Sequence, residues 1–598
     1  MNLQYFYTSQ QQKLEQQILL LKHKGRVFVA GEITLFILFV AFLVLYTLVS
    51  WGIISIVLSM VSLILYGVVR YMDIKNEENI HRLSNLKQVY LHELSYLQGD
   101  YSCFDNGEQY VDAHHPFTFD LDVFGNNSLF QRINRTVTTG GSDYLAAQLS
   151  SIDNHSDRAD AVDELAQKEQ LRADFMALGQ NGRIDSSRIQ KVLNNINQTK
   201  ISAQFAKKFV SLWIAYLLIV GLWLSIVASI FGWVNAQLPI WWTIFQFFGI
   251  LFVCGGACKA ISAEVNQLHE QLKNYVKVIR LVSSTSFKIF QNKAIANNLQ
   301  QALSAFEQLD VILSALDRRG NILGMFIMNA FFLSDFFLVR KFLRCQGQYL
   351  EDFSNGVASV SELDALVSMA TFRYNEPQSG RAEVIERDSM VYEAIDLYHP
   401  FLGAKAVKNN FYLQSQHYYI ITGANMAGKS TFLRALGINY LLAMNGMPVF
   451  ASSLRVSVYH LFSSMRTTDD LAHGISYFNA ELLRLQQLID YCKHNKHTLI
   501  ILDEILKGTN SLDKLNGSRL FLQSISSLPV TGVIATHDLE LSKMQGERYH
   551  NYCFEIALGT QVSYSYKVIQ GVARNQNATF LLKEILGSLQ VKNHSVEA

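Results

Sequence analysis

Two long apolar runs dominate the pattern of hydrophobic and polar positions along the chain. Residues 27–72 are almost continuously apolar, and a second apolar stretch covers residues 209–257. Roughly 20 apolar residues are needed to cross a bilayer, so each run has room for two short spans joined by a turn. The pattern therefore predicts two transmembrane helical hairpins, with spans at about 33–50, 53–69, 209–232 and 240–257.

Positively charged residues flank both predicted hairpins. They are Lys22, Lys24, Arg26, Arg70 and Lys75 around the first hairpin, and Lys207, Lys208 and Lys259 around the second. Lys and Arg next to a span stay on the cytoplasmic side, and Trp241 and Trp242 lie where an interfacial aromatic belt is expected. We therefore expect a multi-pass protein of the cell (inner) membrane, with both chain termini in the cytoplasm.

A third apolar stretch, Ile322–Val339, contains Asn329 and Asp335, two side chains that are costly in lipid. A fifth span would also place the C-terminal part of the chain on the opposite side of the membrane from residues 80–205. We therefore predict a buried soluble helix here. The alternative is a membrane-associated segment.

The polar parts of the chain predict four helical segments, at residues 1–26, 73–115, 116–205 and 260–318. After the turn-forming segment 375–380, strand and helix patterns alternate, which is typical of a parallel sheet. The expected organisation is an N-terminal amphipathic helix, the first hairpin, a helical linker, a helical core over 116–374 that the second hairpin interrupts, and an α/β domain over 381–598.

The composition is consistent with this picture. Of 598 residues 49% are hydrophobic, and the mean hydropathy is +0.12, which is unusual for a soluble enzyme. The net charge of +1 gives no global attraction to DNA, so contact with nucleic acid needs a local basic patch. Lys273, Lys277 and Arg280 form a basic stripe at helical spacing, either a solvated helix face or a phosphate-contacting patch. Cys254 and Cys258 are interpreted as helix-packing residues rather than as a metal pair.

The chemically most specific segment is residues 422–431, Thr-Gly-Ala-Asn-Met-Ala-Gly-Lys-Ser-Thr, between a predicted strand and a predicted helix. Gly423 and Gly428 let backbone N–H groups wrap a phosphate chain at the positive N-terminus of the helix. In such a loop Lys429 reaches the β- and γ-phosphates, and the Ser430 hydroxyl ligates Mg²⁺. The segment predicts a P-loop that binds a nucleoside triphosphate.

Two further predicted strands end at candidate catalytic groups. One ends at Asp503 and Glu504, and the other ends just before His537. We assign Asp503 to Mg²⁺ and Glu504 to orienting or deprotonating the attacking water, with His537 contacting the γ-phosphate or that water. The strand that ends in the two acids is expected to lie directly beside the P-loop strand.

Together these segments resemble the MutS family of DNA mismatch-repair ATPases. The loop is similar to the family's Gly-Pro-Asn-Met-(Ala/Gly)-Gly-Lys-Ser-Thr, with Ala424 in place of Pro. Further similar positions in the α/β region are Asp469, Asp470, Leu471, Gly474, Ser476, Phe478, Glu481, Asp503, Glu504, Gly508, Thr509, Asp513, Ala535, Thr536 and His537, with Leu506-Lys507 replacing a usual Gly-Arg. Outside it, residues 128–130 and 134–138 resemble the start of the family's helical core, and residues 361–366 and 399–400 resemble the segments leading into the ATPase.

The resemblance implies a mixed fold, in which a helical core precedes an ABC-like P-loop ATPase domain, with ATP and Mg²⁺ as cofactors and a homodimer with composite sites. The matching nucleotide-binding positions are Gly423, Ala424, Asn425, Met426, Ala427, Gly428, Lys429, Ser430, Thr431 and Asp513, with Ser476 acting in trans on the other subunit's nucleotide. Ser430 and Asp503 would hold Mg²⁺, and Glu504, His537 and Lys429 would be catalytic. DNA as a partner, mismatched, branched or of non-B form, is implied as well.

The chain also departs from the family. The mismatch-reading N-terminal domain with its Phe-x-Glu wedge and the connector domain have no counterpart, and a membrane hairpin takes the place of the long levers that form the DNA clamp. Neither a helix-turn-helix tail nor an Smr nuclease domain is expected after the ATPase. The aromatic residue expected to stack on adenine is not evident, since Ala406 or Val407 falls near its place, and the stacking partner stays open. We expect a membrane-anchored member that lacks the mismatch reader.

Two other functions compete with a DNA-binding ATPase. One is an ABC-type membrane transport ATPase, but residues 470–476 differ from the Leu-Ser-Gly-Gly-Gln signature of exporters, and the predicted spans offer few polar groups for a pathway. The other is a nucleotide-switched membrane scaffold without DNA binding. The complete set Lys429, Asp503, Glu504 and His537 argues against an inactive site.

Overall fold

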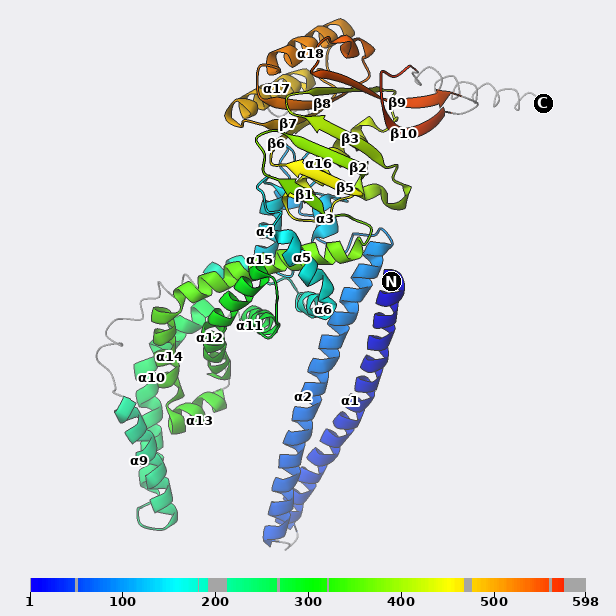
Figure 1. Ribbon diagram of the computed structural model, residues 1–598. Helices are drawn as coiled ribbons and strands as arrows, with labels where there is room; N and C mark the ends of the chain where they lie inside the picture. The colour runs from blue at the N-terminus through cyan, green and yellow to red at the C-terminus, as the bar shows by residue number, and fades with distance from the viewer. Residues whose placement is uncertain are drawn as a thin grey trace, which may run out of the picture. The chain divides into compact units, whose positions relative to one another are not determined.

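The computed structural model describes residues 2–48, 52–180, 182–191, 212–265, 269–319, 322–466, 476–558 and 562–574. Helices dominate up to Asn375, and beyond it strands and helices alternate, so the fold is mixed, as predicted (Figure 1). The chain forms two compact units. The first unit contains residues 1–103, 135–144 and 168–367, and the second contains residues 104–134, 145–167 and 368–598.

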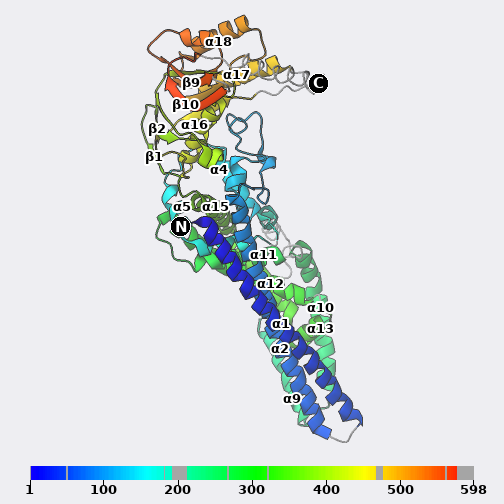
Figure 2. The ribbon, with the colours of Figure 1, turned by 90° about the vertical axis from the view of Figure 1, so that its right-hand side faces the viewer.

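In the first unit, α1 (Leu3–Leu48) and α2 (Gly52–Leu97) run side by side along their whole length (Figure 2). Each helix has 46 residues and is therefore roughly 69 Å long. The expected polar N-terminal helix and the first span are thus one continuous helix, and the second span continues without a break into the helical linker. Arg70 on α2 lies 3.5 Å from the Glu32 carboxylate on α1.

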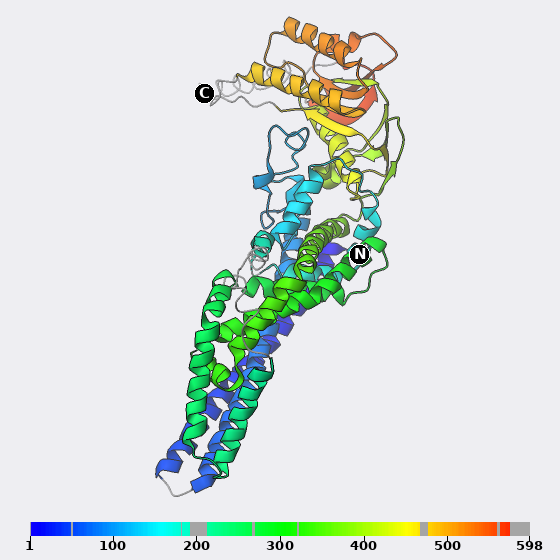
Figure 3. The ribbon, with the colours of Figure 1, turned by 90° about the vertical axis from the view of Figure 1, so that its left-hand side faces the viewer.

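The second apolar run forms α9 (Leu212–Ile230) and α10 (Gln237–Val265), which lie side by side (Figure 3). Gly221 is required where they meet, because a Cβ at this position would lie 2.8 Å from the Trp242 ring. In the part of the chain that the structure describes, four helices are long and apolar enough to cross a membrane, and these are α1, α2, α9 and α10. Cys254 and Cys258 are fully buried on α10, and no cluster of metal-ligating side chains occurs among the described residues.

The rest of the first unit is formed by α6 (Glu169–Ala177), α11 (His269–Ser283), α12 (Phe290–Arg319), α13 (Ile322–Phe332), α14 (Ser334–Gln348) and most of α15 (Leu350–Asn375). The prediction of one buried helix over 322–339 is wrong. Leu333 adopts a left-handed backbone conformation, with φ +51°, and separates α13 from α14. Several large apolar side chains of α13 are exposed, whereas Asn329 and Asp335 are buried.

In the first unit, before α4 (Thr139–Leu149), the segment 134–138, which resembles the start of the family's helical core, meets the segment 361–366, which resembles a segment leading into the ATPase. Asp364 on α15 is buried and accepts hydrogen bonds from the backbone N–H groups of Val137 and Thr138 and from the Thr138 hydroxyl, at 2.7–3.1 Å. Nearby, Arg135 donates to both carboxylate oxygens of Glu93 on α2. These contacts join segments that lie far apart in the sequence.

The second unit contains two sheets and the short helices η1 (Glu108–Tyr110), α3 (Leu129–Ile133), α5 (Arg158–Gln167), η2 (Pro400–Lys405) and η4 (Leu539–Lys543). One sheet has the order β1 (Ala382–Ile385), β5 (Ser453–Ser457), β2 (Val391–Leu397), β3 (Asn409–Gln414). The other has the order β10 (Val562–Gln570), β9 (Tyr549–Leu558), β4 (Tyr418–Gly423), β8 (Val530–Thr536), β7 (Thr498–Asp503), β6 (His460–Ser464). In the second sheet, all strands but β10 are parallel.

Apolar side chains of the strands form the buried core of the six-stranded sheet. The helices that pack on this sheet are α16 (Lys429–Met444), α17 (Tyr477–His494) and α18 (Ser511–Ile525). The expectation that β7 lies directly beside β4 is wrong, because β8 pairs with both strands and separates them. β8, which follows β4 and β7 in the sequence, lies between them in the sheet. The ends of β4, β8 and β7 therefore lie in one row at the same edge.

Candidate functional site

The glycine-rich loop, residues 423–428, joins β4 to the first residue of α16, as predicted. Gly428 has φ +106°, a conformation that favours glycine, and a Cβ there would lie 3.1 Å from the Tyr566 ring. Met426 also has a left-handed conformation, with φ +67°, and its side chain is 76% exposed. Strained backbone of this kind concentrates at functional sites. The loop leaves the N-terminus of a 16-residue helix open to a ligand.

Lys429 is buried at the start of α16, and its side chain turns back into the loop. Its Nζ donates to the carbonyl oxygens of Gly423 at 2.8 Å and Ala424 at 3.0 Å. Burial lowers the pKa of Lys429, and the carboxylates of Asp503 and Glu504 oppose that shift. The ammonium group therefore lies in a partly desolvated position, where it can exchange loop carbonyls for a stronger anionic acceptor.

Glu504 follows β7 and is held in an unusual conformation. Its φ is +62°, and its backbone N–H donates to the carbonyl of Ala535 on β8 at 2.9 Å. His537 Nδ1 lies 2.7 Å from Oε1 of the Glu504 side chain, and Lys514 on α18 donates to Oε2 at 3.3 Å. The structure thus brings together the predicted pair Glu504 and His537, and adds a lysine that the sequence analysis did not single out.

The protonation state of the Glu504 side chain depends on its neighbours. Burial alone would raise the pKa of Glu504, but the hydrogen bond and charge of His537 and the charges of Lys514 and Lys507 hold it below its ordinary value. The carboxylate is therefore ionised at neutral pH. An ionised carboxylate beside an imidazole can orient a water molecule and accept its proton.

A buried carboxylate holds the loop after Glu504 in place. The two oxygens of Glu481 on α17 accept the backbone N–H groups of Lys507 at 2.9 Å and Gly508 at 3.0 Å. Glu481 and Gly508 were matched to separate family segments in the sequence, and the structure shows that they are direct partners. This contact fixes the path of the chain between β7 and α18.

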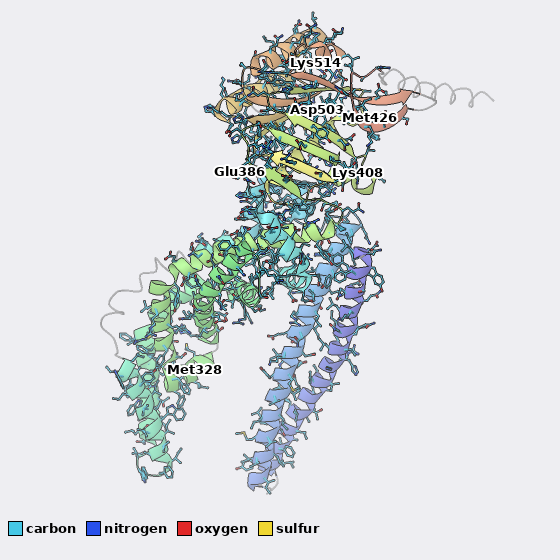
Figure 4. All side chains as sticks on the ribbon, viewed as in Figure 1. Met328, Glu386, Lys408, Met426, Asp503 and Lys514 are labelled. Atoms are coloured by element: carbon cyan, nitrogen blue, oxygen red, sulfur yellow. The ribbon has the colours of Figure 1, made fainter. Side chains whose placement is uncertain are left out.

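A cavity of about 680 Å³ opens beside the glycine-rich loop. Its walls include predicted site residues: Asn425, Met426, Gly428, Lys429, Ser430, Thr431, Asp503 and Glu504 (Figure 4 marks Met426 and Asp503). They also include residues that the sequence analysis did not assign to the site, among them Tyr398, His399, Phe554 and Tyr566. Burial and two nearby arginines lower the pKa of His399 to about 3, so this wall carries a neutral imidazole.

Tyr566 was missed because it lies far along the chain, on β10. At the predicted place of the stacking residue, the non-aromatic Val407 lines the cavity. The Tyr566 ring approaches Gly428 and stacks on Tyr564 with 5.8 Å between ring centroids. The alternating tyrosines of β10 were a signal in the sequence, but only the sheet order brings that strand near the loop.

Other predicted site residues lie elsewhere in the second unit. Ala427 is buried within the loop, and Ser476 is exposed at the N-cap of α17. Asp513 lies in the first turn of α18, where it exchanges hydrogen bonds with Asn510. The predicted motif positions Asp469, Asp470, Leu471 and Gly474 lie outside the described residues.

Comparison with known proteins connects this geometry to a family. Residues 419–582 match the family model for MutS domain V. Among similar proteins, the DNA mismatch repair protein MutS of Thermosipho melanesiensis is 26% identical over 236 residues, which is 38% of this chain and 28% of that protein. The MutS of Ruminiclostridium cellulolyticum is 29% identical over 240 residues, 38% of this chain and 27% of that protein. The MutS of Lachnoclostridium phytofermentans is 34% identical over 176 residues, 28% of this chain and 19% of that protein.

Fold and site first define a class: a mixed helical and α/β protein whose polar groups gather at the ends of parallel strands, around a glycine-rich loop. The family model and the relatives then narrow the class. Over residues 419–582 the chain is similar to domain V of MutS proteins. The matches span less than a third of the length of these relatives.

Proposed function

We propose that this chain is a membrane-anchored ATPase of the MutS type, which hydrolyses ATP with Mg²⁺ at composite sites of a homodimer and binds DNA. One observation carries the proposal: Lys429 and Glu504, which follow two different strands, line one cavity, and His537, which follows a third strand, lies 2.7 Å from the Glu504 carboxylate. The cavity and its glycine-rich loop support a P-loop ATPase fold. The match to MutS domain V supports the same conclusion.

Binding of the phosphates follows from the loop. The phosphate chain would take over the hydrogen bonds that Lys429 now makes to Gly423 and Ala424, because an anionic oxygen is a stronger acceptor than a carbonyl. The free N–H groups at the start of α16 would complete the cradle. On the other wall, Tyr566 offers a flat aromatic face for the base.

Ser430 and Asp503 would hold the metal. Both line the cavity, and a hydroxyl and a carboxylate are oxygen donors of the kind that Mg²⁺ prefers. Bound Mg²⁺ would neutralise charge that develops on the phosphate oxygens. Glu504 would orient the attacking water and accept its proton, while the hydrogen bond to His537 fixes the carboxylate.

A dimer would complete the site. Ser476 is exposed at the start of α17, and Asp513 lies in the first turn of α18, away from the described walls of the cavity. In the proposed dimer, Ser476 would contact the nucleotide held by the second copy of the chain. The exposure of Ser476 supports this action in trans.

Membrane anchoring rests on the four long apolar helices. With positive charge at both ends of each hairpin, the chain would be a multi-pass protein of the cell membrane, with its ATPase domain and both termini on the cytoplasmic side. DNA binding rests on the names of the relatives, which are DNA mismatch repair proteins. On α11, Lys273 and Lys277 are exposed, but Arg280 pairs with Glu307 at 2.7 Å, which favours a solvated helix face over a phosphate-contacting patch.

The test uses the full chain in detergent or nanodiscs. ATP hydrolysis is measured alone and with homoduplex, mismatched, branched and single-stranded DNA, and DNA binding is titrated at low and high salt with and without ATP. We expect Mg²⁺-dependent hydrolysis and DNA affinity that falls steeply with salt. Hydrolysis with no DNA affinity even at low salt would leave a nucleotide-switched membrane scaffold. Stimulation by a small solute but not by DNA would indicate a transporter.

A further inference from the structure

Helix α13 has an unusual surface for a helix outside the four candidate spans. Its 11 residues are apolar except for Asn329. The exposed fractions of its large apolar side chains are 39% for Phe326, 50% for Ile327, 38% for Met328 and 43% for Phe332. A contiguous apolar surface of this kind is unfavourable in water and marks a contact with a membrane or a partner.

Hydrogen bonds tie α13 to the middle of α10. Gln246 Nε2 donates to the carbonyl oxygen of Ala330 at 3.0 Å, and its Oε1 accepts from the indole N–H of Trp242 at 3.1 Å. Gln246 lies roughly 14 Å along α10 from Gln237, at 1.5 Å per residue. If α10 crosses a bilayer, Ala330 lies at a depth where the surroundings are hydrocarbon.

Aromatic contacts place α13 against both helices of the second hairpin. The ring centroids of Phe326 and Phe247 on α10 are 4.9 Å apart, and those of Phe331 and Trp223 on α9 are 5.9 Å apart. Trp223 and Phe247 both belong to the central turns of their helices. Phe326 and Phe332 stay partly exposed beside these ring contacts, and Ile327 and Met328 are exposed as well.

The buried polar side chains Asn329 and Asp335 have partners within the protein, as a lipid environment requires. Asn329 Oδ1 accepts the backbone N–H of Asp335 at 2.8 Å, at the left-handed break of Leu333. The Asp335 carboxylate pairs with Arg319 at the end of α12, at 3.0 Å. Buried polar groups that pair with one another, beside apolar groups that face outward, are the pattern of a membrane protein.

We propose that α13 is a re-entrant membrane segment, which enters the bilayer from the end of α12, packs on α9 and α10, and returns through α14 to the side it came from. At 11 residues α13 is roughly 16 Å long, too short to cross about 30 Å of hydrocarbon. The return limb carries Arg340, Lys341 and Arg344, which suit the cytoplasmic interface.

This inference rests on the proposed membrane anchoring and adds to it. A re-entrant segment crosses nothing, so the residues before α12 and after α14 stay on one side. It therefore keeps the candidate site on the side of residues 80–205.

The first experiment uses the unmodified chain in liposomes that contain lipids with a photoactivatable diazirine in the acyl chain, followed by mass spectrometry. We expect adducts on the peptide that contains residues 322–332, at a level similar to that of the peptide with Phe248 and Phe252, which are exposed on α10. Labelling of α10 without labelling of α13 would overturn the re-entrant segment alone. No labelling of α1, α2, α9 or α10 would overturn membrane anchoring itself.

A second experiment determines whether lipid or protein covers the exposed side chains of α13. Met328 on α13 (Figure 4) and the control position Leu520 on α18, 66% exposed, are each changed to Cys for spin labelling, after replacement of the six native cysteines. We expect Met328→Cys to be more accessible to oxygen than to a water-soluble nickel complex, and Leu520→Cys to show the reverse. Equal or greater access of nickel to Met328→Cys, or low access of both reagents, would contradict a lipid-facing α13.

Discussion

Two carboxylates, one in each unit, show how differently the chain uses charge. Asp364 in the first unit is fully buried and accepts hydrogen bonds from the backbone and side chain of its own helical core. Glu504 in the second unit keeps some exposure, has a strained φ of +62° and is held by two ionisable side chains, His537 and Lys514. Burial raises the pKa of Asp364 to about 7, against the effect of its donors, whereas the neighbours of Glu504 lower its pKa.

The difference separates a structural role from a chemical one. The partners of Asp364 are mostly backbone groups, which cannot release it without local unfolding. The partners of Glu504 are side chains beside a cavity, which can move when a ligand arrives. A substitution at Asp364 should therefore affect folding, and a substitution around Glu504 should affect turnover.

The largest expected effect on ATP affinity comes from Lys429→Met. The change removes the ammonium that would hold the β- and γ-phosphates, and charge-assisted hydrogen bonds of this kind contribute about 1.5–3 kcal/mol each. We expect the affinity for ATP to fall by about 10²–10³-fold in calorimetric titration. The matched control is Lys543→Met, which removes an exposed lysine that pairs with Glu540. Equal loss of affinity in both variants would contradict the role of Lys429.

The next effect is on stability. Asp364→Ala would leave the N–H groups of Val137 and Thr138 buried without acceptors, at a cost of about 1–3 kcal/mol for each group. We expect a clearly lower midpoint of thermal unfolding, with ATP affinity unchanged at temperatures where the protein is folded. Asp163→Ala breaks the partly exposed pair with Arg373 and should cost less than about 1 kcal/mol. Equal destabilisation by the two substitutions would contradict the structural role of Asp364.

The sequence predicted some features of the candidate site and missed others. The glycine-rich loop, the strand ends and Glu504 were found because spacing along the chain sets their chemistry. The placement of β8 between β4 and β7, and the approach of Tyr566 to the loop, depend on pairing between distant strands. Local patterns do not encode such pairings.

The wrong prediction of one buried helix over residues 322–339 has the same cause, because local patterns do not encode contacts with distant helices. An apolar stretch with one Asn and one Asp has the composition of a buried helix. Its exposure depends on Gln246 and Arg319, which supply partners from other helices, and on the break at Leu333. Those partners were not visible from the stretch itself.

The pH dependence of unfolding gives a finer test of the carboxylate comparison. Asp364 has a folded pKa of about 7, above its ordinary 3.8, so the folded state retains a proton that the unfolded state loses. Its contribution to stability is therefore largest below pH 4 and is lost as pH rises toward 7. We expect the thermal midpoint of the wild type to fall relative to that of Asp364→Asn over this range. A constant difference between the two midpoints would contradict a raised pKa.

The smallest expected effect is that of Lys514→Met. The change frees one oxygen of Glu504 and removes a positive charge 3.3 Å away, which should make the carboxylate a better base. We expect the turnover number to rise by about 2–5-fold, with little change in KM, whereas Lys514→Arg should stay near the wild type. A lower turnover number in Lys514→Met would show that the lysine positions Glu504 productively.

The central claim is that Glu504 activates water at an ATP-binding cavity. It is tested most directly by phosphate release from ATP in nanodiscs, with the wild type and Glu504→Gln compared side by side, with and without Mg²⁺. The account predicts Mg²⁺-dependent release by the wild type and a turnover number about 10²–10⁴-fold lower in the variant, which still binds ATP. Equal turnover in the two proteins, or no Mg²⁺-dependent hydrolysis by the wild type, would contradict it.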